Sequence, residues 1–176
     1  MAVIIETDPE VKFTQPLDKR TNTTTHLILH HADMYGTVKK VHDVHLGIGY
    51  RGIGYNFYIL RDGNIYQGRG WEYIGAHCAT KDGTVDCNPY SIGICFEGRY
   101  HNIDRVLPLA QKNAGTKLIA EALTKYPTIK TICGHKDMMP KWEPTACPGQ
   151  YFPLADLIRV GWSSLVPVPG VPVSGV

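Results

Sequence analysis

The stretch "HLILHHAD", residues 26–33, joins a short apolar run to two adjacent histidines. The β character of the run predicts a buried strand over residues 26–31. Successive side chains of a strand point to opposite faces of its sheet, so His30 and His31 must face in opposite directions. Only one of these two histidines can therefore contribute to a given site.

Outward from this strand, the apolar patterns alternate between strand and helix periodicities. Helical spacing occurs in residues 37–47, 108–126 and 151–162. Strand-like runs occur in residues 55–60, 65–68, 90–98 and 128–134, with Asp-Gly supplying a hairpin turn between the first two. This alternation predicts an α/β domain built around a central mixed β-sheet.

The composition is that of an ordinary globular protein. The chain has 176 residues, 43% hydrophobic and 19% charged, and a net charge of +2, which does not favour a nucleic-acid partner. No apolar window is long enough to predict a transmembrane segment, and the first ten residues do not resemble a signal peptide. We therefore expect synthesis in the cytoplasm.

The chain is expected to contain one domain, residues 1–162, followed by a linker. Residues 163–176 are uncharged and rich in Pro, Gly and Val, a composition typical of an extended linker. We expect this linker to lead to a further module. The five cysteines are an odd number, which predicts free or metal-bound thiols, although Cys78 and Cys87 could pair if the protein were exported.

A second stretch, "GHKDMMPKWEPTACPG", residues 134–149, places His135 and Cys147 twelve positions apart. A catalytic zinc site uses three protein ligands, such as imidazole nitrogen and thiolate sulfur, and leaves one position for water. A histidine of the first stretch would supply the third ligand. Spacing alone leaves three possibilities open: a zinc site, a metal-free Cys–His hydrolase pair, or residues with no catalytic role.

Two further stretches occur between these, "GIGYNFYILRDGNIYQGRGW" at 52–71 and "GAHCATKDGTVDCNPYSIGICFEG" at 75–98. Together, and in this order, the four stretches resemble the zinc-dependent N-acetylmuramoyl-L-alanine amidase family, which includes phage lysozyme-type amidases and peptidoglycan-recognition proteins. The resemblance covers about residues 26–158. It implies a central mixed β-sheet flanked by helices, with a zinc site in an open surface groove that accepts peptidoglycan.

The resemblance also implies site residues. His30, the first histidine of the pair, is the expected zinc ligand, together with His135 and Cys147. Tyr55 of "GIGYNF" corresponds to a tyrosine beside the zinc water in hydrolytic members, and Thr145 precedes the cysteine as in recognition-protein amidases. Both are expected to be catalytic, by orienting water or stabilising the oxyanion. For Tyr55, a role as a core aromatic is the alternative.

Substrate contacts are expected from His77 of "GAH" and from Asn88, which line the groove in the family. Trp71 could offer an aromatic wall to a sugar or a stem peptide, although an exposed turn would also explain it. For His77, a hydrogen bond to the backbone is the alternative. Family members commonly separate the last His and Cys by eight positions rather than twelve, and we expect the longer loop to form part of the groove rim.

The implied activity is zinc-dependent hydrolysis of the amide bond between N-acetylmuramic acid and the L-alanine of the stem peptide. A non-catalytic peptidoglycan-binding module is the alternative, because many relatives lack a ligand. A wall amidase without a signal peptide that ends in a linker resembles the monomeric catalytic half of a phage endolysin, released to the wall when a holin opens the membrane. A bacterial autolysin is the alternative setting.

Overall fold

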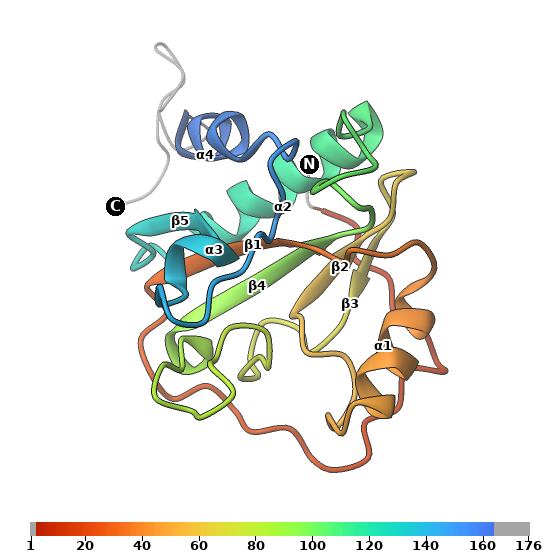
Figure 1. Ribbon diagram of the computed structural model, residues 1–176, viewed down its shortest axis with the longest axis vertical. Coiled ribbons are helices and arrows are strands. Elements are labelled where there is room, and N and C mark those ends of the chain that lie inside the picture. The colour runs from red at the N-terminus through yellow and green to blue at the C-terminus, as the bar shows by residue number, and fades with distance from the viewer. Residues whose placement is uncertain (1–2, 164–176) are drawn as a thin grey trace, which may run out of the picture.

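A five-stranded mixed sheet forms the centre of the protein, seen in a computed structural model that describes residues 3–163 (Figure 1). The strand order is β3-β2-β4-β1-β5. The bounds are β1 His26–His31, β2 Phe57–Ile59, β3 Ile65–Gln67, β4 Ser91–Phe96 and β5 Thr131–Gly134. Strand β1 pairs in parallel with β4 and β5, β2 pairs in parallel with β4, and β3 is antiparallel to β2. The predicted mixed sheet is confirmed.

The stretch with the two histidines forms the most protected strand. Because β1 lies between two neighbours and is covered on both faces, Leu27, Ile28 and Leu29 are completely buried. Its backbone register places His30 beside Cys95 of β4. The carboxyl ends of β1, β4 and β5 consequently meet at one edge of the sheet.

Four α-helices and one short 3-10 helix occur in the described residues. They are α1 Val38–Gly47, η1 Asn88–Tyr90, α2 Leu109–Lys125, α3 His135–Met138 and α4 Leu154–Ser163. The three predicted helices are confirmed to within a few residues at each end. Helix α3 was not predicted, and it starts where the Asp137 carboxylate accepts the Gly134 N–H at 2.8 Å.

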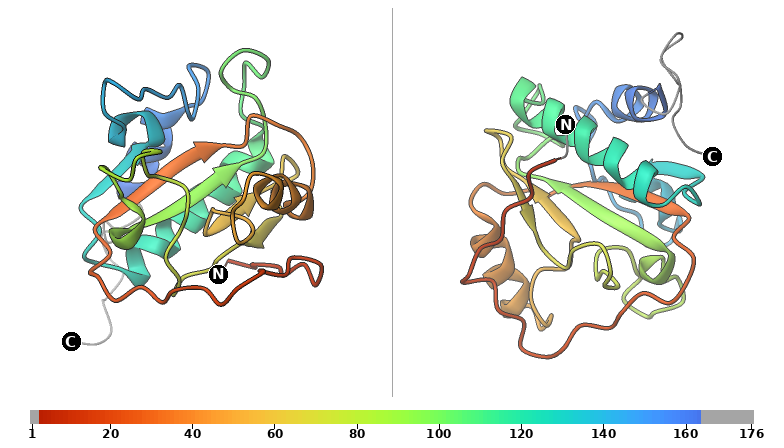
Figure 2. Two further views of the ribbon diagram at one scale, coloured as in Figure 1. Left: turned by 60° about the horizontal axis from the view of Figure 1, so that its bottom comes forward. Right: turned by 180° about the vertical axis from the view of Figure 1, so that it is seen from behind.

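The helices cover the two faces of the sheet unequally. Helices α2 and α4 share one apolar cluster with Leu27 and Leu29 of β1, and Figure 2 shows α2 crossing that side of the sheet. On the opposite face, α1 packs through Val38 and Val41 against the side of the sheet that holds Tyr58. Loops and the short helices η1 and α3 also cover this second face, where Tyr90 and Met138 belong to the cluster around Ile28.

The hairpin between β2 and β3 turns where Asp-Gly was predicted to turn it. Gly63 has a φ of +93°, a conformation that residues with a Cβ rarely adopt, and the Asp62 carboxylate accepts the N–H of Asn64. No helix within residues 3–163 is long and apolar enough to cross a membrane. Ser163, the first residue of the predicted linker, is instead the last residue of α4, and the rest of that linker lies outside the described residues.

Candidate metal centre

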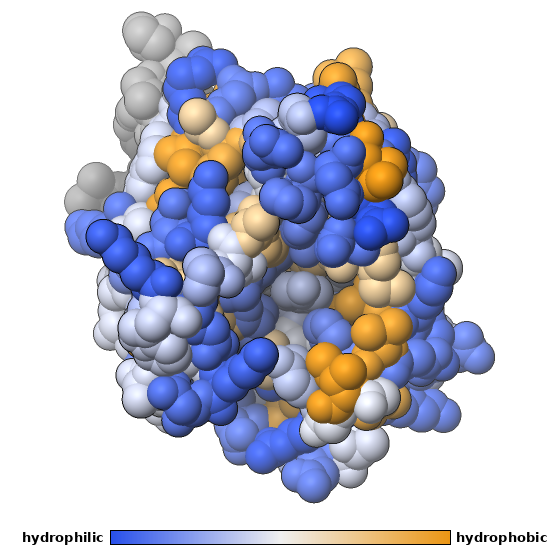
Figure 3. All heavy atoms as spheres, in the orientation of Figure 1, coloured by the Kyte–Doolittle hydropathy of each residue, from blue (hydrophilic) through white to orange (hydrophobic). Residues whose placement is uncertain are grey.

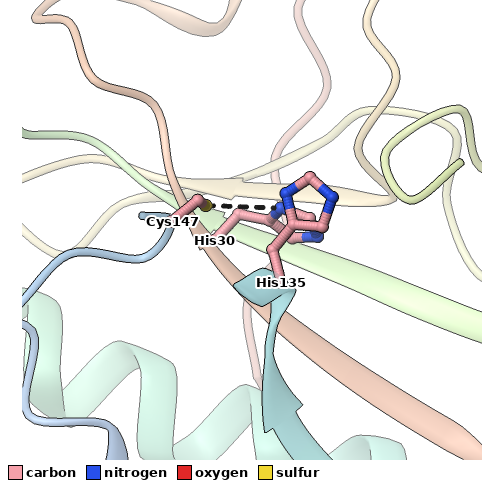
Figure 4. Close-up of side chains that lie close together, drawn as sticks. All are labelled: His30, His135 and Cys147. Carbon is pink, nitrogen blue, oxygen red and sulfur yellow. Dashed lines mark hydrogen bonds between the residues drawn. The ribbon is translucent and has the colours of Figure 1, made fainter. Parts of the chain in front are cut away.

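Three side chains converge at the carboxyl edge of the sheet (Figure 4). His30 lies near the end of β1, His135 is the first residue after β5, and Cys147 lies in the loop before α4. One ligand atom from each lies within 4.8 Å of the other two. The distance from Cys147 Sγ to His30 Nδ1 is 3.6 Å. The structure thus brings together the three residues predicted as zinc ligands.

Strand alternation separates the two adjacent histidines. His31 points to the α2 face, where its Nδ1 accepts the N–H of Tyr100 at 3.1 Å. His30 points to the other face, with its ring centroid 4.6 Å from that of His135. Only His30 of the pair therefore belongs to the group: alternation predicted that one of the two would, and the resemblance implied the first.

The segments that carry His135 and Cys147 are joined backbone to backbone. Lys136 donates its N–H to the carbonyl of Cys147 at 2.8 Å. A Cβ at Gly134 would lie 2.7 Å from the Pro148 ring, so the two segments are in close contact there. The Thr145 hydroxyl accepts the Cys147 N–H at 3.2 Å. These contacts close the base of the twelve-residue loop.

The tip of that loop reaches toward a second loop. The Glu143 carboxylate accepts the N–H of Lys81 at 3.2 and 3.3 Å, and Trp142 is 60% exposed. Lys81 belongs to the segment that also contains His77 and Asn88. The extra residues of the loop therefore lie outside the ligand group.

His77 lies beside the group, against His30, and Asn88 lies against His77. Both are buried, with exposed fractions of 8% and 6%. His77 Nδ1 is 3.0 Å from His30 Nε2, and the His77 N–H is donated to Asn88 Oδ1 at 2.8 Å. The residues predicted to line the groove thus contact a candidate ligand and each other.

Tyr55 borders the group from the side of β2. Its ring centroid lies 5.2 Å from that of His30. Burial, together with the nearby thiols of Cys95 and Cys147, raises the pKa of the Tyr55 phenol well above its usual value of 10. The phenol is consequently neutral at physiological pH, and a side-chain hydrogen bond joins it to Cys95.

His45 of α1 is a neighbour of the site that the sequence analysis does not include among the candidate residues. Its ring centroid lies 5.3 Å from that of Tyr55, and its Nδ1 accepts the Gly54 N–H at 2.8 Å. Burial lowers the pKa of His45 to about 4, with a smaller contribution from Arg69. Its position four residues after Val41, on the inward side of α1, was the available signal.

Trp71 does not join the site. Its ring packs against Phe57 and Tyr126, at centroid distances of 4.2 and 6.2 Å, in the cluster shared with α2. Phe57 points to the α2 face of the sheet, so the tryptophan that packs on it lies on the face opposite His30. The expected aromatic wall is therefore not part of this group.

The donor set suits zinc. Burial lowers the pKa of His135 to about 4 and that of His30 well below 6.5, so both rings are neutral and can offer lone pairs. His135 Nε2 is buried and has no hydrogen-bond partner among the described residues. In a tetrahedral site, the usual Zn–N and Zn–S bond lengths place nitrogen and sulfur about 3.6 Å apart. The His30–Cys147 distance matches this separation.

Comparison with known proteins places the chain in a family. Residues 20–150 match the N-acetylmuramoyl-L-alanine amidase family, and the chain belongs to it. Peptidoglycan-recognition protein SC1a of Drosophila melanogaster is 34% identical over 154 residues, which cover 81% of this chain and 75% of that protein. The family and this relative support either a peptidoglycan amidase or a peptidoglycan-recognition protein.

Solved structures confirm the predicted fold. The N-acetylmuramoyl-L-alanine amidase LysC from Clostridium intestinale superposes with a TM-score of 0.76 at 28% identity, over 89% of this chain and 95% of that chain. A variant of Drosophila PGRP-LB in complex with tracheal cytotoxin superposes with a TM-score of 0.67 at 28% identity, over 84% and 87% of the two chains.

Proposed function

We propose that the protein is a zinc-dependent amidase that cleaves the bond between N-acetylmuramic acid and the L-alanine of the peptidoglycan stem. The observation that carries this proposal is the His30, His135 and Cys147 group, whose ligand atoms lie within 4.8 Å of one another beside Tyr55. Three protein ligands leave a fourth position for water or substrate, which is the arrangement of catalytic zinc.

The three ligands define the charge of the centre. When bound, zinc acts as a Lewis acid that lowers the pKa of water toward ~7 and polarises a carbonyl group. Burial raises the pKa of the Cys147 thiol to about 12, so the thiol holds its proton while no cation is bound. Binding of a cation would release that proton, because a metal ligand must be a thiolate. The two neutral imidazoles add no charge, and the thiolate cancels one charge of the metal.

The hydroxyl groups of Tyr55 and Thr145 can stabilise the negative charge that develops on the oxygen of the scissile carbonyl. Tyr55 remains protonated because its pKa is raised, so it can donate a hydrogen bond to the oxygen of the scissile carbonyl as charge accumulates there. The Thr145 hydroxyl accepts the Cys147 N–H and keeps its own proton for a second donation. His45 sits behind Tyr55 and limits the positions of its ring.

Peptidoglycan is the proposed partner, as a muramyl peptide. The face shown in Figure 3 is hollowed near its centre, with hydrophilic residues around much of the hollow and apolar residues on the side where α1 lies. Val44 and Ile48, at the end of α1, are 45% and 64% exposed. A ligand that joins polar sugars to a peptide containing alanine suits such a mixed surface.

The proposed setting is that of an endolysin, with residues 1–162 as a monomeric catalytic domain and residues 163–176 as a linker to a wall-binding module. The support is the endolysin amidase LysCS of Clostridium intestinale, which superposes with a TM-score of 0.77 at 28% identity, and the composition of the last fourteen residues. In this setting the enzyme acts at the bacterial wall after release from the host cytoplasm.

Mass spectrometry of digested peptidoglycan tests the activity. We expect free stem peptides that begin with L-alanine, loss of this release with a zinc chelator, and its recovery when zinc is added. Tyr55→Phe should keep its zinc and lose most of the release, whereas Tyr66→Phe, a matched change on β3, should keep both. Tight wall binding by the zinc-loaded protein without any released peptide would instead identify a recognition protein.

A further inference from the structure

The second ring nitrogen of His30 is engaged by another histidine. His30 Nδ1 faces Cys147 Sγ at 3.6 Å, and His30 Nε2 lies 3.0 Å from His77 Nδ1. A neutral imidazole carries one proton, so His30 can offer a lone pair at Nδ1 only when Nε2 holds that proton. The nitrogen that receives the resulting N–H is His77 Nδ1.

We infer that His77 is a positioning residue, whose Nδ1 accepts the Nε2–H of His30 and thereby fixes the tautomer and orientation that expose His30 Nδ1 to the metal. The inference rests on the proposed zinc site and adds to the expected contact of His77 with substrate. It assigns His77 a part in the affinity of the centre for zinc.

The surroundings of His77 hold its ring in place. Its backbone N–H is donated to the buried Asn88 side chain at 2.8 Å. A Cβ at Gly75 would lie 2.3 Å from the His77 ring, and a Cβ at Gly93 would lie 2.5 Å from it. The ring therefore occupies a slot between two glycines, and side chains at either position would displace it. Because its own orientation is fixed, the His77 ring can in turn fix the orientation of the His30 ring that it contacts.

The protons of the pair can be assigned by elimination. The two facing nitrogens, His30 Nε2 and His77 Nδ1, lie 3.0 Å apart, so one of them carries the shared proton and the other accepts it. If His77 donated from Nδ1, His30 would carry its proton at Nδ1, against the Cys147 sulfur, and could not bind metal there. Metal binding therefore requires the arrangement in which His77 accepts.

That arrangement has a cost at the far side of the His77 ring. Its proton then lies on Nε2, an atom that is buried and has no hydrogen-bond partner among the described residues. With the protons reversed, the same buried atom would be an unpaired acceptor, so its lack of a partner does not favour either arrangement. Partners of metal-binding histidines commonly change metal affinity by about 10–100-fold.

A pair of substitutions of nearly equal shape separates hydrogen bonding from packing. Asn places an oxygen close to the position of His Nδ1, and Leu has the same branching without an acceptor. We expect His77→Leu to weaken zinc binding by roughly 10–100-fold and His77→Asn to weaken it by no more than roughly threefold. Zinc affinity is measured by competition with a chromogenic chelator on the full chain, with thermal unfolding of each zinc-free protein as the folding control.

A second measurement does not depend on zinc. Long-range proton–nitrogen NMR spectra of the zinc-free protein report which ring nitrogen of His30 carries the proton. We expect the Nε2–H form in the wild type and in His77→Asn, and a mixture of both forms in His77→Leu. A wild-type His30 protonated at Nδ1 would overturn the inference even if His77→Leu failed to fold.

The outcomes separate the inference from the proposed function. Equal zinc affinity in wild type and His77→Leu, or an equal loss in both variants, would show that the acceptor at position 77 does not matter. If the wild type bound no zinc, the proposed amidase function would fail on that result alone. The NMR spectra would still decide whether His77 sets the tautomer of His30.

Discussion

Acidification should destabilise the protein through His45, and the size of the effect follows from its environment. Burial lowers the pKa of His45 to about 4, and its Nδ1 already accepts the Gly54 N–H. The unfolded chain, with an ordinary histidine pKa near 6.5, therefore binds a proton at a higher pH than the folded protein does. The contribution of neutral His45 to the free energy of unfolding is therefore fully present above about pH 6.5 and is lost as the pH falls toward 4.

The difference between these two pKa values corresponds to a loss of about 3.4 kcal/mol in the free energy of unfolding once His45 is protonated in both states. Between pH 7.5 and 5.0 the same linkage gives about 2 kcal/mol, and the partial exposure of the ring reduces the expected loss to about 1–2 kcal/mol. His45→Asn keeps an acceptor for Gly54 and has no titrating group, so it should remove this part of the acid sensitivity.

Urea unfolding, followed by circular dichroism at pH 7.5 and 5.0, measures the effect. Other buried histidines also lower stability in acid, so the informative quantity is the difference between the pH-dependent losses of the wild type and of His45→Asn. We expect the wild type to lose about 1–2 kcal/mol more than the variant does. Equal losses would refute the assignment of this acid sensitivity to His45.

Two further changes test the ligand group and the packing of the sheet. We expect the wild type to retain equimolar zinc after dialysis, measured by elemental analysis, and Cys147→Ser to lose it. Cys95→Ala changes a nearby thiol outside the ligand group and should keep the zinc. Zinc retained without Cys147 would contradict the ligand assignment. Gly115→Ala should lower the unfolding free energy by about 1–3 kcal/mol, because its methyl would lie 2.6 Å from the ring of Phe96. At Gly47 an added methyl meets nothing within 4 Å, so Gly47→Ala should raise the unfolding free energy by up to about 1 kcal/mol. Urea unfolding measures both glycine variants, and a loss at Gly47 as large as that at Gly115 would contradict this reasoning.

Much of the architecture could be predicted because it depends on local periodicity. The alternation of "LILHH" places its two histidines on opposite faces of any sheet, and the structure has His31 against Tyr100 and His30 at the ligand group. The Asp-Gly turn and the three longer helices also follow from short stretches of sequence. Helix α3 was missed because its four residues are too few to show a period.

The surroundings of the ligands could not be predicted from such patterns. His77 is buried because Gly75 and Gly93, from a loop and a strand, leave a slot for its ring, a coincidence that exists only after folding. Trp71 follows a short edge strand, where its sequence position does not reveal the face on which it packs. Its actual neighbours, Phe57 and Tyr126, are 14 and 55 positions away along the chain.

The closed base of the loop between His135 and Cys147 has a consequence for how such a protein can diverge. Because the backbone N–H of Lys136 donates a hydrogen bond to the Cys147 carbonyl, the two ends of the loop are held together independently of the number of residues between them. Insertions at the tip, near Trp142, can therefore accumulate without a change at the ligands. The loop is a site where natural variation or laboratory libraries can explore new specificities while the chemistry is inherited unchanged.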